Sequence, residues 1–240
     1  FRRVLFRSAE PEGLARLIPQ LTSDVVVFGF SKWYEPNGAE RGRWIGPDIA
    51  ERCPASGREA QLGYLLQKGC YTACAWNKAV RRELFSSCDL RFREGVTSED
   101  IDWCARLALA AKSFGLSACR FYRYRQRTGS ITRTMNLKSL RDLKENIELC
   151  LRLPQEMGAS TAIKELYWSY VAYQFGTFLV CAPSVNGPEG RGLVQEMREK
   201  RWLLRYNAAS RKVQLLYVVD RLLGYRALCL LCRGYAAIRK

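Results

Sequence analysis

The stretch Thr97-Ser98-Glu99-Asp100-Ile101-Asp102-Trp103 decides how we interpret the fold of this chain. Thr97 and Asp100 have the spacing of a capping box, in which two side chains three residues apart satisfy backbone N–H groups at the start of a helix. Apolar residues then recur at helical spacing, as Ile101, Trp103, Cys104, Leu107, Ala108 and Ala111. The pattern predicts a helix from about Ser98 to Phe114, with the carboxylates at its beginning, where a loop can expose them.

The carboxylates of this stretch have a structural and a chemical interpretation. Capping boxes are common, and the helix dipole favours acidic residues in a first turn, so a helix cap alone would explain them. Asp100 and Asp102 also form a D-x-D pair. Because residues two apart on a helix point to different sides, we do not predict a metal chelate at this pair.

Several motifs flank the predicted helix. Before it stand Trp76-Asn77-Lys78, Arg81-Arg82-Glu83-Leu84-Phe85 and Leu90-Arg91-Phe92-Arg93-Glu94-Gly95. After it stands Tyr122-Arg123-Tyr124-Arg125-Gln126-Arg127-Thr128-Gly129-Ser130-Ile131-Thr132. We predict a helix over residues 75–85 and strands over residues 24–30 and 116–125, so helices and strands alternate as in an α/β layer.

In this order, the motifs resemble the family 2 glycosyltransferases with the GT-A fold. The likeness is greatest to the bacterial branch that builds capsular, exopolysaccharide and lipopolysaccharide glycans, and it covers roughly residues 24–132. It implies an α/β fold in which residues 9–135 form the C-terminal, acceptor-side half of a GT-A domain. Residues 136–240, where strand signals stop, would be an all-α C-terminal extension.

The resemblance also implies roles for the acidic pair. Asp100 would be the catalytic base, and Glu99 would lie beside it on the acceptor. A positioned carboxylate can take the proton of an acceptor hydroxyl while that oxygen attacks the anomeric carbon. One base without a covalent intermediate implies a single displacement with inversion, in which a sugar moves from a nucleotide-sugar donor to a glycan or lipid-linked acceptor.

Four further residues are candidates for substrate contacts. Lys78, Arg125 and Arg127 are cations that could bind the leaving diphosphate, although helix and strand surfaces carry such residues routinely. Trp76 could stack on an acceptor sugar ring, and the alternative is an ordinary core tryptophan.

The expected metal site depends on residues that we do not find in this sequence. The family binds its donor with an N-terminal strand-helix-strand unit that ends in a D-x-D, which holds a divalent metal, Mg or Mn, on the diphosphate. No such unit precedes Glu10, and residues 10–14 resemble the short helix that follows it. We therefore expect a fragment without the donor-binding half or the metal ligands, and without activity on its own.

The first eight residues, Phe1-Arg2-Arg3-Val4-Leu5-Phe6-Arg7-Ser8, read as the translation of a common sequencing-library adapter. We expect them to be an artefact and exclude them from the fold prediction, as one does for expression scars. Without their three arginines, the formal net charge falls from +16 by three, to +13. The alternative is a native basic start.

Composition limits the remaining possibilities. A strongly positive charge and a pI near 9.6 indicate an anionic partner, such as a nucleotide diphosphate or an acidic membrane surface. Histidine is absent, which excludes Ser-His-Asp and Cys-His catalysis from these residues. Of the ten cysteines, Cys229 and Cys232 form the only close pair, which we interpret as packing residues in a reducing, cytoplasmic compartment.

The C-terminal half is predicted to be helical. Periodic apolar residues indicate helices over residues 137–153 and 163–181, the second aromatic and better explained as a buried helix than as a membrane span. Residues 193–206 and 210–239 are basic and amphipathic. They would dock on their own domain or lie on the inner face of the cell membrane. The alternative function is therefore a basic, non-catalytic helical protein that binds a membrane or nucleic acid, although we expect no nucleic acid because no binding motif is present.

Overall fold

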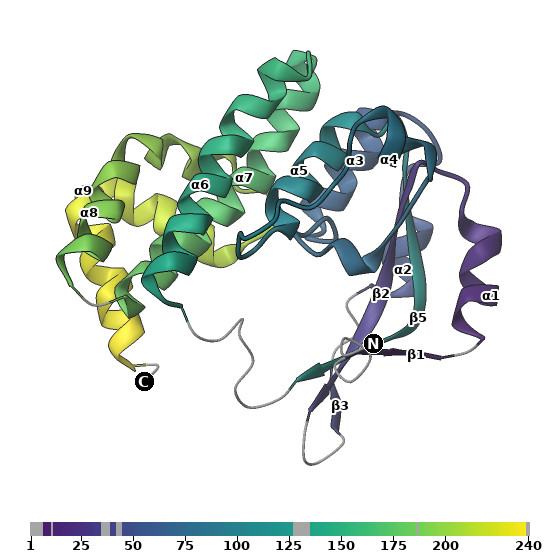
Figure 1. The fold of residues 1–240 in the computed structure, drawn as a ribbon, viewed down its shortest axis with the longest axis horizontal. Coiled ribbons are helices and arrows are strands. Elements are labelled where there is room, and N and C mark those ends of the chain that lie inside the picture. Colours follow the sequence, from purple (N-terminus) through teal and green to yellow (C-terminus); the bar gives the residue numbers. More distant parts are fainter. Residues whose placement is uncertain are drawn as a thin grey trace. The chain divides into compact units, whose positions relative to one another are not determined.

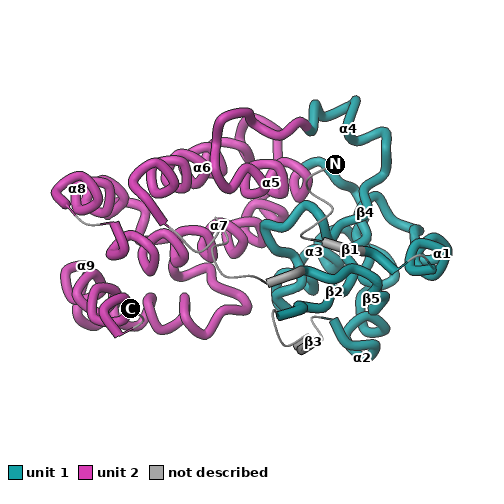
Figure 2. Tube along the Cα trace, turned by 60° about the horizontal axis from the view of Figure 1, so that its bottom comes forward, with its two compact units in different colours: residues 1–90, 110–134 teal, residues 91–109, 135–240 magenta. Residues whose placement is uncertain are grey.

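The chain has a mixed α/β fold that divides into two compact units (Figures 1 and 2). The computed structural model describes residues 7–10, 12–34, 39–41, 45–126, 135–185 and 187–238. Unit 1 comprises Phe1–Leu90 and Ala110–Thr134, and unit 2 comprises Arg91–Leu109 and Met135–Lys240. The predicted α/β class is confirmed. Residues 91–109 belong to the same unit as the C-terminal helices, whereas the motifs predict that they belong to one domain with the rest of residues 9–135.

Unit 1 contains a mixed sheet. In the described residues, its strands are β1 (Arg7–Ala9), β2 (Val25–Tyr34), β3 (Ala39–Arg41), β4 (Lys78–Val80) and β5 (Phe114–Gln126). Their order is β1-β5-β2-β3, with β4 also paired to β2. The β2–β5 pair is parallel, and the other described pairs are antiparallel. The valine run that opens β2 is buried without interruption, as expected for a central strand covered on both faces.

Close backbone approaches determine where glycine is needed in unit 1. The β2–β5 register shifts between Phe28 and Phe30, and a Cβ atom on Gly29 would lie 2.9 Å from Arg120 Cγ. A Cβ on Gly13, at the start of α1 (Gly13–Leu17), would lie only 1.9 Å from Phe121 Cβ on β5. Helix α1 therefore packs directly on the sheet. The cluster beneath it contains Leu17, Val26, Phe28 and Phe121.

The remaining helices of unit 1 are short, apart from α3. They are η2 (Ile18–Gln20), α2 (Pro47–Glu51), α3 (Arg58–Gln67), η3 (Ala75–Asn77) and α4 (Glu83–Ser87). The helix predicted over residues 75–85 is wrong, because this segment forms η3, β4 and α4 in succession. Its middle pairs with β2, with Val80 opposite Val25. Arg81 then donates from Nε to Asp24 Oδ1 over 2.8 Å, so tertiary pairing overrides local helix propensity.

Unit 2 is helical in its described residues. Its elements are α5 (Asp100–Ala110), α6 (Leu137–Glu156), α7 (Thr161–Cys181), η5 (Ala182–Ser184), α8 (Pro188–Glu196), η6 (Met197–Tyr206) and α9 (Arg211–Ile238). The predicted helices over residues 137–153 and 163–181 are confirmed. Local chemistry sets their boundaries: the side chains of Asn136 and Ser160 accept from Ser139 N and Ile163 N, and Gly158 adopts a φ of +60° between the helices.

Helix α7 lies at the centre of unit 2, in contact with α6, α9 and η6. Three of its large aromatic side chains, Tyr167, Phe175 and Phe178, are fully buried. Tyr167 Oη donates to Cys150 O over 2.9 Å, and Tyr170 Oη donates to Ile101 O over 2.7 Å. The aromatic composition of α7 therefore builds a helical core. Within the described ranges, no helix has both the length and the hydropathy that are needed to cross a bilayer.

Candidate functional site

The acidic pair stands where a loop turns into α5. Glu99 precedes the helix, Asp100 is its first residue, and both are half-buried. Ser98 has a φ of +59°, a left-handed conformation that is uncommon outside glycine, and Ile101 N donates to Ser98 O over 3.0 Å. The Thr97 hydroxyl is buried and has no hydrogen-bond partner among the described residues, so Thr97 does not cap the helix as predicted.

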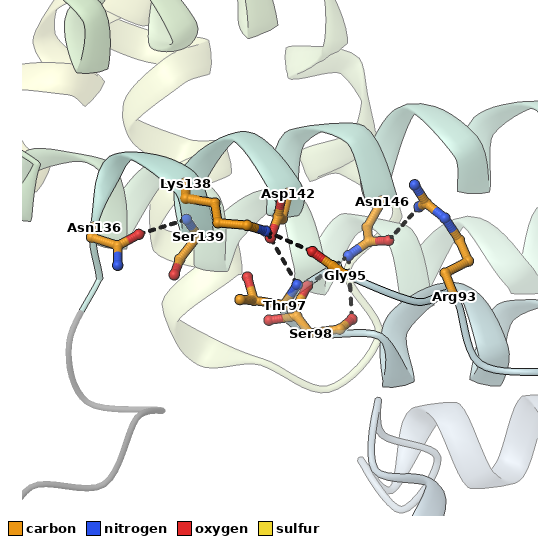
Figure 3. A network of polar contacts seen from close by, with 9 residues as sticks. All are labelled: Arg93, Gly95, Thr97, Ser98, Asn136, Lys138, Ser139, Asp142 and Asn146. Atoms are coloured by element: carbon orange, nitrogen blue, oxygen red, sulfur yellow. Dashed lines mark hydrogen bonds and ion pairs between the residues drawn. The ribbon is translucent and has the colours of Figure 1, made fainter.

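Instead, α6 holds the loop by its backbone (Figure 3). Asp142 Oδ2 accepts from Thr97 N over 2.7 Å and from Lys138 Nζ over 2.6 Å. Lys138 Nζ also donates to Gly95 O over 2.8 Å. Gly95 has a φ of +71°, so the loop turns sharply where this ammonium group binds it.

Asn146, one turn further along α6, contacts the same loop at two places. Its Nδ2 group donates to Thr97 O over 3.3 Å and to Ser98 O over 3.2 Å, while its Oδ1 atom accepts from Arg93 Nη1 over 3.0 Å (Figure 3). Asn146 is fully buried. Its donors and acceptor are therefore satisfied by the segment that leads into Glu99, and the start of α5 is fixed from a distant part of the sequence.

These anchoring residues are not evident from the sequence motifs around Glu99 and Asp100. Lys138, Asp142 and Asn146 recur every fourth position, so they form a polar stripe on a helix that also buries Leu140, Leu143 and Ile147. Such a stripe on an amphipathic helix is a signal for buried polar contacts. The loop that it contacts lies more than 40 positions away, however, and no local pattern identifies that partner.

The Asp142 carboxylate is adapted to this role. Burial alone would raise its pKa, but hydrogen bonds from Lys138 and from the Thr97 N–H favour the ionised form and leave the pKa below its ordinary value. The ionised carboxylate therefore accepts from two donors near neutral pH, and these charge-assisted bonds are stronger than neutral ones.

Asp102 lies on another side of α5 from Asp100. It is 1 % exposed, and its Oδ2 atom accepts from Arg106 Nη2 over 3.0 Å. A buried carboxylate with this partner is not available to bind a metal together with Asp100. Among the described residues, no group of three or more Cys, Asp or Glu side chains is arranged to hold a metal ion. The described carboxylates therefore do not fit the divalent metal that the family resemblance implies.

Lys78 and Trp76 belong to unit 1, whereas Glu99 and Asp100 belong to unit 2. Lys78 is buried, and its ammonium group lies 4.8 Å from the centre of the Tyr71 ring. It donates to Thr72 O, Cys74 O and Asn77 Oδ1 over 2.7, 2.8 and 3.1 Å. Three donors thus bind three protein acceptors, and a contact with diphosphate would require Lys78 to give up one of them.

Trp76 is half-buried in an aromatic cluster on the sheet. The centroid of its ring lies 4.9 Å from that of Tyr122, on which it stacks, and 5.2 Å from that of Tyr124, to which it is tilted. The ring of Phe30 meets it edge-on, with the two centroids 4.6 Å apart. The cluster accounts for Trp76 as a packing residue, and the sugar contact stays a prediction. The backbone of Arg125 pairs with Trp33 in the sheet, but the Arg125 side chain and the whole of Arg127 lie outside the described residues.

Comparison with models of known protein families and with curated proteins finds no match for this chain.

Proposed function

We propose that this chain contributes the acceptor side of an inverting, family 2 glycosyltransferase of the GT-A type. The enzyme would move a sugar from a nucleotide-sugar donor to a glycan or lipid-linked acceptor during cell-surface polysaccharide synthesis. One observation carries the proposal: the half-buried pair Glu99–Asp100 stands at the start of a helix, on a loop whose backbone is fixed by the buried side chains Asp142 and Asn146.

In the proposed reaction, Asp100 is the general base. Its carboxylate takes the proton of the acceptor hydroxyl, the acceptor oxygen forms a bond to the anomeric carbon, and the bond from that carbon to the diphosphate breaks. The nucleoside diphosphate leaves with the bonding electron pair. Attack from the opposite side of the ring inverts the configuration. A bound divalent metal would offset charge on the diphosphate.

Glu99 would orient the acceptor for this proton transfer. A general base is effective only when its carboxylate lies within hydrogen-bonding distance of the hydroxyl that it deprotonates. The α6 contacts with the backbone of residues 95–98 restrict how the two carboxylates can move. Restricting a catalytic group in advance lowers the entropy that must be lost in the transition state.

The decisive experiment is the Asp100→Asn substitution in the polypeptide encoded by the complete reading frame. With purified acceptor and labelled nucleotide-sugar, we expect turnover to fall at least about a hundredfold, because the amide cannot accept the proton. The Glu94→Gln variant is a matched control, because Glu94 is an exposed carboxylate in the same loop. Glu99→Gln should raise the KM for the acceptor and leave the KM for the donor unchanged.

Near-wild-type turnover of Asp100→Asn would exclude Asp100 as the base. An equal loss in Glu94→Gln would show that the effect reflects the charge of the loop and not a specific role of Asp100. A product that retains the anomeric configuration would exclude single displacement altogether.

A further inference from the structure

Helix α9 is the longest element of the described chain and is broken at Gly224. This glycine has φ 78° and ψ 169°, so it divides α9 into two helical halves. Each half buries one side. Val213 and Leu216 are buried in the first half, and Tyr225, Leu228 and Cys232 are buried in the second. The side away from these residues is not covered by the described part of the chain.

That outward side is apolar in both halves. Leu215, Val218 and Leu222 are spaced at i, i+3 and i+7 on the first half, and Leu222 is 74 % exposed. On the second half, Leu230 is 64 % exposed, and Ile238 is 87 % exposed. A helix that only docked on its own domain would show polar residues on this side. We call Leu215, Val218, Leu222, Leu230, Leu231 and Ile238 the α9 apolar face.

Basic side chains border this face. Within Arg211–Ile238 the sequence has five basic residues and one acidic residue, Asp220. The basic residues are all exposed, and in the described part of the chain none of them forms an ion pair: Arg211, Lys212, Arg221, Arg226 and Arg233. Asp220 is half-buried and lies 3.8 Å from Arg201 of η6, so it does not neutralise them.

A cavity adjoins the second half of α9. It has a volume of about 490 Å³ and lies between α9, α8 and η5. Leu179, Val185 and Val194 give it apolar walls, and Arg191 and Arg233 add two exposed guanidinium groups. Arg233 belongs both to the cavity and to the basic border of the α9 apolar face. An apolar hollow with cations beside it matches the chemistry of an anionic lipid.

We propose that α9 docks the protein on an anionic phospholipid bilayer, with the α9 apolar face in the headgroup–acyl boundary and the bordering cations on lipid phosphates. Apolar side chains on one side of a helix and Arg or Lys beside them are the pattern of an interfacial helix. This inference rests on α9 alone and does not depend on the proposed catalysis.

Charge and chemistry favour a bilayer over two other occupants. A second copy would bring two sets of unpaired cations together, and like charges across an interface are unfavourable. Nucleic acid would satisfy the cations, but single strands are bound sequence-independently by aromatic side chains on which bases stack, and the six residues of the α9 apolar face are all aliphatic. The exposed tyrosines of α9, Tyr217 and Tyr235, are not among these six. Only an anionic bilayer uses both the leucines and the arginines.

The test is co-sedimentation of the full chain with vesicles. We expect binding to equal parts of phosphatidylcholine and phosphatidylglycerol at least about tenfold tighter than to phosphatidylcholine alone, and weaker binding in high salt. The double variants Leu215→Glu/Leu222→Glu and Leu230→Glu/Leu231→Glu should each weaken binding at least about tenfold. Arg226→Gln/Arg233→Gln should weaken it about fivefold for each arginine.

Matched controls come from unit 1. Leu14→Glu replaces a leucine that is 58 % exposed, and Arg52→Gln removes an exposed arginine, so neither should change vesicle binding. The substituted residues are all exposed, and an unchanged circular dichroism spectrum would confirm that each variant is folded. Glutamate variants that bind as tightly as the wild type would overturn the proposal. The proposal would also be overturned if the wild-type chain did not bind mixed vesicles and formed a dimer that the glutamate variants disrupt. Release of the wild-type chain from mixed vesicles by single-stranded RNA would overturn it too.

Discussion

The ammonium group of Lys78 binds three protein acceptors, two of them backbone carbonyls of the segment just before it. The third acceptor is the side chain of Asn77, which is itself fully buried. A cation in this position stabilises the turn that leads into β4, and this turn positions the strand that pairs with β2. The contacts thus give Lys78 a structural role that the sequence motif does not reveal.

We predict that Lys78→Met lowers the free energy of unfolding by on the order of 3 kcal/mol, because buried acceptors lose their donor while the side chain keeps its length. Urea denaturation would measure this. Lys68→Met is the control, because Lys68 is exposed and its substitution should lower the free energy of unfolding far less. Wild-type stability of Lys78→Met, together with weakened binding of a nucleotide diphosphate, would instead support the role in donor binding.

Burial also determines the chemistry of the cysteine thiols. All ten cysteines lie in the described residues, and none of them forms a disulfide there. Burial raises the pKa of Cys232 to about 12 and also raises that of Cys229, so both thiols stay protonated at neutral pH. A protonated thiol is a poor nucleophile and a poor metal ligand. The properties of Cys229 and Cys232 therefore agree with their interpretation as packing residues.

At the scale of elements, the anchoring of the loop by α6 should depend on pH. The folded-state pKa of Asp142 is lowered, so its contribution to stability is present above the ordinary carboxyl pKa of about 4 and is lost as pH falls through the lower folded value. The loop over residues 93–98 should consequently loosen in acid before the core of unit 2 unfolds.

We predict that Asp142→Asn speeds hydrogen–deuterium exchange of residues 95–98 at neutral pH by about tenfold, because a charge-assisted acceptor is lost. The ratio of the variant rate to the wild-type rate should approach one as pH falls through the lowered folded-state pKa of Asp142, because the wild-type carboxyl then becomes protonated too. Glu145→Gln, an exposed change on the same helix, should leave the ratio near one at every pH. A ratio for Asp142→Asn that is independent of pH would contradict this account.

Helix α9 gives a second prediction at this scale: two glycine substitutions should change the free energy of unfolding in opposite directions. The dihedral angles of Gly224 fall in a region that is almost restricted to glycine, so Gly224→Ala should cost about 1–3 kcal/mol. Gly234 lies in the same helix without a positive φ and with open space around its Cα, so Gly234→Ala should stabilise by up to about 1 kcal/mol. Thermal denaturation of both variants checks this. A Gly224→Ala variant that is as stable as the wild type, or more stable, would mean that Gly224 is not strained.

Some elements could be predicted from local patterns, and others could not. The valine run of β2 and the apolar periodicity of α6 and α7 each indicate their own structure, because a buried strand and an amphipathic helix differ in spacing. Residues 75–85 could not be predicted, because their conformation depends on pairing with a strand some 50 positions earlier. The sequence indicated that the acidic pair stands at the start of a helix, but it did not identify the buried Asn146 that contacts the loop before it.

On the scale of the whole molecule, the two units interrupt each other along the chain. Unit 1 stops at Leu90 and resumes at Ala110, and the segment between them belongs with the C-terminal helices (Figure 2). Both segments of unit 1 are needed for its sheet, because β2 pairs with β4 on one edge and with β5 on the other. Neither unit is therefore a continuous stretch of sequence.

The parallel pairing of β2 with β5 has a consequence for synthesis. As the nascent chain leaves the ribosome, the valine-rich strand emerges long before Phe114, the residue that will lie beside Val25. β4 can cover one edge of that strand early, while the other edge waits until α5 and then β5 have been translated. An apolar strand with an open edge is prone to aggregation. Between the emergence of β2 and that of β5, the growing polypeptide should therefore depend most on a chaperone.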